Sequence, residues 1–171
     1  TRPCGEPPPA KCNHVSARTM EIYRRLGIAG EIRNAGLPGD YPNDVSFRTT
    51  FTGIELARIP IPRRNDRYSA TDGPDTGWPT PEPPHRINQI YLEPILSERA
   101  AATAEISLYW HTEFKSLLQN ETGVTATLQS IDSGETVRAR CDYLVGCDGS
   151  SSTVRRSIGS RFGGDAVLQR C

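Results

Sequence analysis

The stretch "DYLVGCDGSSSTVR", residues 142–155, joins an apolar run to an Asp-Gly pair, a row of serines and an arginine. The run 143–146 has the composition of a buried β-strand, and Asp148-Gly149 is a typical turn dipeptide. Ligands bind at the carboxyl ends of strands in open α/β folds, and a helix that starts with serines presents hydroxyls and amides to phosphate or ribose. The spacing alone leaves two interpretations open: a ligand-binding turn with Arg155 near an anion, or an ordinary turn in which Asp148 caps the backbone and Arg155 is solvated.

The composition indicates one soluble domain or part of one, with 171 residues of which 36% are hydrophobic and 23% charged. Twenty basic and twenty acidic residues give a formal net charge of zero, which provides no polycationic surface for nucleic acid. No apolar run approaches the roughly 18 residues of a membrane-spanning helix. The five cysteines are scattered, without a C-x-x-C pair or a His/Cys cluster at metal spacing. We therefore expect a reducing, cytoplasmic location, no membrane span, no nucleic-acid partner and no metal site.

Three segments carry helical signals. A helix is predicted after Ser16, which is placed to cap it, and is expected to end at Gly27. A second short helix is predicted around Glu31 to Ala35, and a third with Pro94 in its first turn.

The strand signals lie between and after these helices. The segment 45–61 is rich in β-branched and aromatic residues around Thr52-Gly53, which predicts a hairpin. The following proline-rich segment, 65–85, is expected to be irregular. Strand-like runs at 106–119, 123–131 and 136–146, broken by turn residues, predict a β-meander. The expected fold class is therefore a mixed α/β (α+β) fold.

The opening stretch resembles the second flavin-site motif of the FAD-dependent aromatic-ring hydroxylases, the class A flavoprotein monooxygenases that include phenol and p-hydroxybenzoate hydroxylases. That motif consists of two apolar residues, two small ones, Asp-Gly, and then Ser and Arg at fixed intervals. Tyr143 departs from it, because the strict pattern prefers a charge there. The matching positions are Leu144, Val145, Gly146, Cys147, Asp148, Gly149, Ser152, Val154 and Arg155.

Two further stretches are similar to the same family and stand in the family's order. "AKCNHVSARTMEIYRRLG", residues 10–27, looks like the segment in which a basic residue, here Lys11, faces the flavin nucleotide and an Arg-Thr pair, here Arg18-Thr19, begins a helix. "INQIYLEPILSERA", residues 87–100, is similar to the segment whose glutamine, here Gln89, contacts the ribityl chain or the pyrophosphate. The resemblance covers most of residues 10–160.

Two family features are missing from the sequence. The family holds the ADP half of FAD with a G-x-G-x-x-G turn, and no such turn occurs here. "GGDAV", residues 163–167, imitates the family's Gly-Asp motif but has no following histidine, so we interpret it as a coincidence. We expect an internal or truncated piece of a Rossmann-like FAD/NAD(P)-binding domain, in which residues 10–40 and 86–160 form the FAD-binding part and 41–85 begin the substrate-binding part. An unpaired sheet edge would make its independent stability doubtful.

The resemblance implies a function. It implies FAD as cofactor, NADPH or NADH as co-substrate, and transfer of one oxygen atom of dioxygen to a phenolic or polyketide-like small molecule. A homodimer of the full-length protein is compatible with it. The cofactor-binding residues that it implies are Lys11, Arg18, Gln89, Asp148, Gly149, Ser152 and Arg155.

The catalytic residues are not readable from the sequence, and His14 is the one candidate. It lies where some relatives place residues near flavin and substrate, so it could assist deprotonation of a phenol; the alternative is an exposed or capping histidine. His85 and His111 are expected to be structural. Two other functions stay open: a truncated, non-catalytic remnant that binds no flavin, and a flavin-dependent dehydrogenase or reductase.

Overall fold

The computed structural model describes residues 13–74, 76–77 and 80–164. The chain divides into two compact units, one running from Pro7 to Ser107 and one containing Leu108–Cys171. We call them the first and the second unit. Lys11 and most of the "GGDAV" stretch lie outside the described residues.

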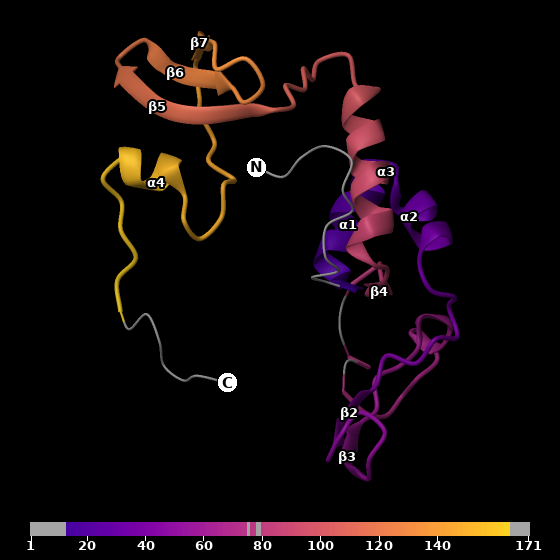
Figure 1. Cartoon of the computed structure of the whole chain (residues 1–171). Helices are drawn as coiled ribbons and strands as arrows, with labels where there is room; N and C mark the ends of the chain where they lie inside the picture. Colours follow the sequence, from indigo (N-terminus) through magenta and orange to yellow (C-terminus); the bar gives the residue numbers. More distant parts are fainter. Residues whose placement is uncertain (1–12, 75, 78–79, 165–171) are drawn as a thin grey trace. The chain divides into compact units, whose positions relative to one another are not determined.

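The first unit is built on three helices, α1 (Ala17–Arg25), α2 (Ala29–Ala35) and α3 (Gln89–Ala101), which Figure 1 shows packed together. The Ser16 hydroxyl caps α1 by accepting a hydrogen bond from the Thr19 amide, as its sequence predicts. The chain leaves α1 through Gly27, whose φ of 77° is a conformation that glycine adopts without a steric penalty. These local signals therefore predicted the first two helices correctly.

The helix α3 begins earlier than the sequence analysis placed it. Asn88 is its N-cap and accepts a hydrogen bond from the Ile90 amide, so Pro94 lies inside the helix and not in its first turn. A proline there has no amide to donate to the carbonyl four residues earlier, which belongs to Ile90. The prediction was wrong because it gave the proline more weight than the Asn88 cap.

The hydrophobic core of the first unit lies between these helices. Met20 of α1 and Ile32 of α2 are fully buried. Tyr23, Leu92 and Leu96 pack against the core from its border. The buried members are Val15, Met20, Ile28, Ala29, Ile32, Ile87 and Ile95.

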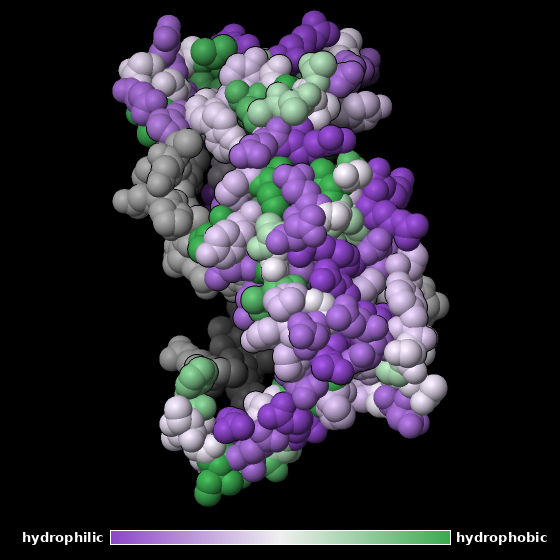
Figure 2. All heavy atoms as spheres, turned by 90° about the vertical axis from the view of Figure 1, so that its right-hand side faces the viewer, coloured by the Kyte–Doolittle hydropathy of each residue, from purple (hydrophilic) through white to green (hydrophobic). Residues whose placement is uncertain are grey.

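Two short antiparallel pairs complete the first unit. Strand β1 (His14–Val15) pairs with β4 (His85–Arg86), so that His14 lies opposite Arg86. Strands β2 (Val45–Arg48) and β3 (Glu55–Ile59) form the predicted hairpin, with a register shift after Phe47, and a 3₁₀ turn, η1 (Arg64–Asp66), follows. Figure 2 shows a largely hydrophilic face with several separate apolar patches, one of them at the lower end, over this hairpin. The hairpin buries none of its strand residues in the core.

The second unit contains an antiparallel meander of β5 (Thr112–Asn120), β6 (Gly123–Ser130) and β7 (Thr136–Cys141), followed by α4 (Thr153–Ser157). The predicted meander is confirmed, and so is the mixed fold class (Figure 1). The strand predicted from residue 106 is wrong in its first part, because residues 106–111 are not paired. His111 instead occupies a turn with a φ of 53° and bonds Asp132 through Nδ1 at 2.9 Å.

The apolar run that opens the signature stretch is not a paired strand. β7 ends at Cys141, and residues 143–149 have no regular secondary structure. Tyr143 is 88% exposed and Val145 is 79% exposed. A strand exists only by hydrogen bonding to a neighbour, and the described residues place none beside this run, so its strand-like composition alone does not produce the predicted strand.

No helix within the described ranges has the length and apolar character needed to cross a membrane.

His85 makes the stability of the first unit depend on pH. His85 is 3% exposed and its Nε2 lies 3.1 Å from the Ile32 carbonyl oxygen, so the neutral ring donates a hydrogen bond from Nε2 to that oxygen. Burial lowers the pKa of His85 to about 4. The stabilisation from the neutral ring is complete above the unfolded-state pKa of about 6.5 and is lost as the pH falls toward 4.

We expect protonation of His85 alone to lower the free energy of unfolding by up to about 3 kcal/mol as the pH falls from about 6.5 to about 4. Urea unfolding of the wild type and of His85→Gln at several pH values measures this cost. The wild type should lose more free energy of unfolding on acidification than the variant. Equal losses in the two proteins would contradict the assignment.

Candidate functional site

The carboxylate of Asp148 is held at the start of α4. Its Oδ1 accepts from the Ser152 hydroxyl at 2.5 Å, and its Oδ2 accepts from the backbone amides of Thr153 at 2.6 Å and Val154 at 3.2 Å. The Ser152 hydroxyl oxygen in turn accepts from the Arg155 amide at 2.9 Å. These bonds, that of Ser152 first, lower the pKa of Asp148 to about 2. The carboxylate is therefore a permanent anion that fixes the first turn of α4.

Gly149 lies between these groups with its backbone uncovered. Its φ is 82°, which favours glycine, and a Cβ at this position would meet no atom within 4 Å. The backbone of the turn is thus open to a flat ligand on this side.

Arg155 is held by an aromatic ring. Its guanidinium carbon lies 4.0 Å from the centroid of the Phe162 ring. A guanidinium stacked in this way is held over the ring face while the donors at its edge remain directed outward in its own plane. Arg155 can therefore still donate to an anion from its place on Phe162.

A hollow of about 500 Å³ lies beside this turn, within the second unit. Strand β6 contributes Val124 and the unpaired run contributes Leu144. Ser152, Val154 and Arg155 line it from α4 and its cap. Of the four predicted residues of this turn, Ser152 and Arg155 line the hollow, whereas Asp148 and Gly149 are not part of its lining.

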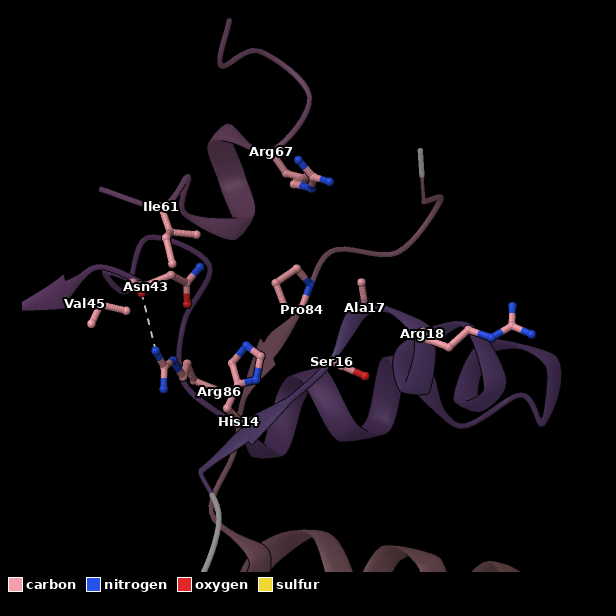
Figure 3. Close-up of a pocket in the computed structure, with 10 residues that line it drawn as sticks. All are labelled: His14, Ser16, Ala17, Arg18, Asn43, Val45, Ile61, Arg67, Pro84 and Arg86. Atoms are coloured by element: carbon pink, nitrogen blue, oxygen red, sulfur yellow. Dashed lines mark hydrogen bonds between the residues drawn. The ribbon is translucent and has the colours of Figure 1, made fainter. Parts of the chain in front are cut away.

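The first unit has a pocket of its own, with a volume of about 420 Å³ (Figure 3). Elements far apart in the sequence meet there: β1 and the start of α1, the segment before β2, the end of η1, and β4. Its described lining consists of His14, Ser16, Ala17, Arg18, Asn43, Val45, Ile61, Arg67, Pro84 and Arg86.

His14 and Arg18 both line this pocket but differ in direction. Figure 3 shows Arg18 extending along α1, away from the other basic side chains. Its guanidinium bonds Glu21 at 3.0 Å, and its side chain is 80% exposed. The pKa of Glu21 lies below its usual value, first because of the Thr80 hydroxyl and then because of Arg18. Arg18 is therefore an exposed, paired residue at the rim, whereas His14 is opposite Arg86 in the β1–β4 pair.

Gln89 is the first residue of α3, and its side-chain amide donates to the Glu93 carboxylate. It lines neither of the two cavities described here. Its predicted role toward a cofactor stays a prediction, as does that of Lys11.

Sequence reasoning missed three polar residues of the first unit's pocket: Asn43, Arg67 and Arg86. The sequence held one weak signal that Arg86 faces away from the core. In "HRI" it stands between His85 and Ile87, both of which the fold buries. Alternation along a strand turns Arg86 to the opposite side from them. No comparable pattern marks the other two.

Within the part of the chain that the structure describes, no group of three or more His, Cys, Asp or Glu side chains could hold a metal ion.

Comparison with known proteins shows a match to a protein family over almost the whole chain. The model of the family described as "FAD binding domain" matches residues 5–170. The 2,4-dichlorophenol 6-monooxygenase of Delftia acidovorans is 34% identical over 156 residues, which are 86% of this chain and 24% of that protein. A putative polyketide hydroxylase of Streptomyces halstedii is 31% identical over 156 residues, covering 89% of this chain and 26% of that protein.

A solved structure agrees with these matches. The flavin-dependent monooxygenase PieE, crystallised with FAD and substrate, has a TM-score of 0.74 and 33% identity, over 88% of this chain and 25% of that chain. The chain thus spans about a quarter of the length of the proteins that it matches.

Proposed function

The chain belongs to the FAD-binding domain family, and from this premise we propose that it forms part of an FAD-dependent monooxygenase that hydroxylates a small aromatic molecule with dioxygen and NADPH or NADH. Relatives named for the hydroxylation of chlorophenols and polyketides support a phenolic or polyketide-like substrate.

The turn from Asp148 to Arg155 carries this proposal. FAD needs a backbone that a flat or phosphorylated group can approach and donors for its oxygens. The uncovered Gly149, at a φ of 82°, meets the first need, and the stacked Arg155 meets the second. The residues present therefore fit the cofactor.

Each predicted residue then has a distinct task. Asp148 and Ser152 hold the turn in shape through the bonds at the start of α4. Gly149 and Arg155 would contact the cofactor, and we propose the same for Lys11, Arg18 and Gln89. When bound, FAD supplies the transfer of electrons from the nicotinamide and the activation of dioxygen. The protein orients the aromatic ring and excludes water.

His14 is the proposed group for proton transfer at the substrate hydroxyl. It lines the pocket of the first unit, where apolar Val45 and Ile61 could receive a ring. A neutral imidazole within hydrogen-bond reach of a phenol can accept its proton as oxygen transfer proceeds.

We also propose the division of labour between the segments, with residues 10–40 and 86–160 serving FAD and 41–85 serving the substrate. A homodimer of the full-length protein and a cytoplasmic location, the latter favoured by the scattered cysteines, belong to the same proposal.

Purification of the whole gene product that contains this sequence tests the proposal. We expect a yellow protein that oxidises NADPH or NADH when a phenol is added, with one hydroxylated product formed per nicotinamide oxidised. A colourless protein that does not take up FAD would point to the non-catalytic remnant. Nicotinamide oxidation without any hydroxylated product, over a panel of phenols and polyketide aromatics, would favour the dehydrogenase or reductase.

A further inference from the structure

A narrow recess of about 10 Å³ lies in the first unit between the link from α2 to β2, the turn η1 and the strand β4. No aspartate or glutamate is among its described lining residues. A cavity of this size holds one particle about as large as a water molecule, and no ring or phosphate group fits into it. Its polar lining consists of Tyr41 and Asn43 from the link, Arg64 from η1, and His85 and Arg86 from β4.

Arg64 brings to this recess a charge that the fold does not compensate. Its side chain is half-buried, and its guanidinium makes no hydrogen bond or ion pair with any residue that the structure describes. A Cβ on Gly39 would lie 3.0 Å from its Nη2, which places the guanidinium against the link between α2 and β2. Burial, and then the charge of Arg33, lower the pKa of Arg64. A partly desolvated cation beside a second cation is unfavourable unless an anion lies close to it.

Strand β4 supplies a second guanidinium. The Nη1 of Arg86 donates to the Asn13 side-chain oxygen at 3.2 Å and its Nη2 to the Asn43 carbonyl at 3.4 Å (Figure 3). Both acceptors are neutral, and the buried Nε of Arg86 makes no hydrogen bond within the described part of the chain. Arg86 can therefore still gain from a charged acceptor, because hydrogen bonds to ions are stronger than those to neutral oxygens.

Positive charge exceeds negative charge around the recess. His85 shows that Arg64 lies close to β4, because the pKa of His85 is lowered first by burial and then by the charges of Arg33 and Arg64. Among the described residues, Glu82 is the carboxylate that pairs with Arg33, at 2.5 Å, and no carboxylate pairs with Arg64 or Arg86. Three guanidinia thus share one carboxylate, and a narrow site with such an excess of positive charge attracts a small anion.

We infer that this recess binds a small inorganic anion of the size of chloride, held between the guanidinia of Arg64 and Arg86. The anion would pair with two cations that the fold leaves without a carboxylate, and it would connect η1 to β4. An anion that binds the folded state alone stabilises that state, so the first unit should become more stable as the anion is added. The site goes beyond the proposed function, because no flavin, nicotinamide or aromatic substrate takes part in it.

The test is thermal melting of the whole gene product at rising potassium chloride, with potassium gluconate keeping the ionic strength constant. Gluconate is too large for the recess, so we expect the melting temperature to rise with chloride and to level off. Arg64→Gln should raise the chloride concentration of half-maximal effect at least about tenfold, since it removes a charged hydrogen-bond donor. Arg64→Lys, which keeps the charge, should need less chloride than Arg64→Gln.

A matched control and a second probe locate the effect. Arg25→Gln removes an arginine at the exposed end of α1, outside the lining of the recess, and should respond to chloride as the wild type does. In gluconate, Arg64→Gln should melt no lower than the wild type, because it removes a cation without a partner. Bromide should replace chloride, and its anomalous scattering in a crystal of the gene product should lie between Arg64 and Arg86.

Equal melting temperatures in chloride and gluconate would show that the recess takes water and would overturn the inference. The same holds for a chloride response that Arg64→Gln leaves unchanged, or that Arg25→Gln changes as much. A response that FAD abolishes would assign the two guanidinia to the cofactor and would also contradict the anion site. Since the melts contain no flavin or substrate except in that last arm, a failed chloride response leaves the proposed function standing.

Discussion

Replacing Asp148 by alanine is expected to lower the affinity of the whole gene product for FAD by at least about tenfold. The substitution removes the acceptor of three hydrogen bonds at the start of α4, from the Ser152 hydroxyl and the amides of Thr153 and Val154. Loss of these bonds leaves the first turn of α4 less ordered, and binding that requires the formed turn must supply the free energy of ordering it. Quenching of flavin fluorescence on titration measures the affinity.

Two further variants distinguish loss of a negative charge from loss of the hydrogen bonds that shape the turn. Glu121→Ala removes an exposed carboxylate from the same unit, outside the lining of the hollow, and should leave the affinity near that of the wild type. Asp148→Asn keeps one oxygen acceptor, which can still accept from the amides of Thr153 and Val154, and its NH2 group can donate to the Ser152 hydroxyl oxygen. It should therefore retain more affinity than the alanine variant if Asp148 acts by shaping the turn. If the alanine variant binds FAD as tightly as the wild type, the turn does not belong to the cofactor site.

Replacing Glu82 by glutamine is expected to destabilise the first unit by about 3 kcal/mol, because it leaves a buried guanidinium without its carboxylate. Arg33 Nη2 lies 2.5 Å from Glu82 Oε2 and also donates to the Pro83 carbonyl at 3.0 Å. The side chains of Arg33 and Glu82 are only 16% and 14% exposed. The Nη1 of Arg33 is already buried without a hydrogen bond, and the Pro83 carbonyl that remains for the guanidinium is a neutral acceptor.

This ion pair attaches the end of the proline-rich segment to the helices. Thr80 adds a hydrogen bond to Glu21 of α1, and Arg24 of α1 lies 3.7 Å from Glu82. The same segment places Pro84 and Arg86 at the pocket. We therefore expect Glu82→Gln to weaken ligand binding in the pocket together with stability.

Urea unfolding measures the cost of Glu82→Gln, with Glu98→Gln on the exposed face of α3 as the control, for which a change within about 0.5 kcal/mol is expected. A double replacement, Arg33→Met with Glu82→Leu, should recover most of the loss, because apolar residues of similar volume can replace a buried pair. A cost for Glu82→Gln no larger than that of the control would show that the ion pair contributes nothing.

The sequence predicted those parts of the fold that depend on neighbouring residues. The Ser16 cap and the turn at Gly27 are local, and α1 lies where they place it. Turn residues that separate the strand-like segments likewise predicted the hairpin and the meander. Competing local signals explain the error at α3, where Pro94 suggested a later start than the Asn88 cap sets.

Features that depend on distant residues could not be predicted in this way. The run 143–146 has strand composition, but strand pairing needs a neighbour that composition does not supply. The pocket of the first unit forms because β1 pairs with β4, which brings His14 opposite Arg86 from a distant part of the chain. The candidate turn from Asp148 to Arg155 was found because it is one continuous stretch, whereas Asn43, Arg67 and Arg86 were missed because they come from separate segments.

The candidate residues are proposed to bind a cofactor that the family also holds with a Gly-rich turn, and no such turn occurs in these 171 residues. The most direct measurement is an FAD titration, followed by fluorescence quenching and thermal melting, of the chain alone and of the chain joined at its N-terminus to the Gly-rich strand-turn-helix unit of a family member. We expect tight binding and a cooperative, FAD-stabilised melt only in the joined protein, and loss of that binding in its Asp148→Ala variant. Tight binding by the chain alone would show that the Gly-rich turn is dispensable, and no binding by either protein would contradict the assignment of these residues to an FAD site.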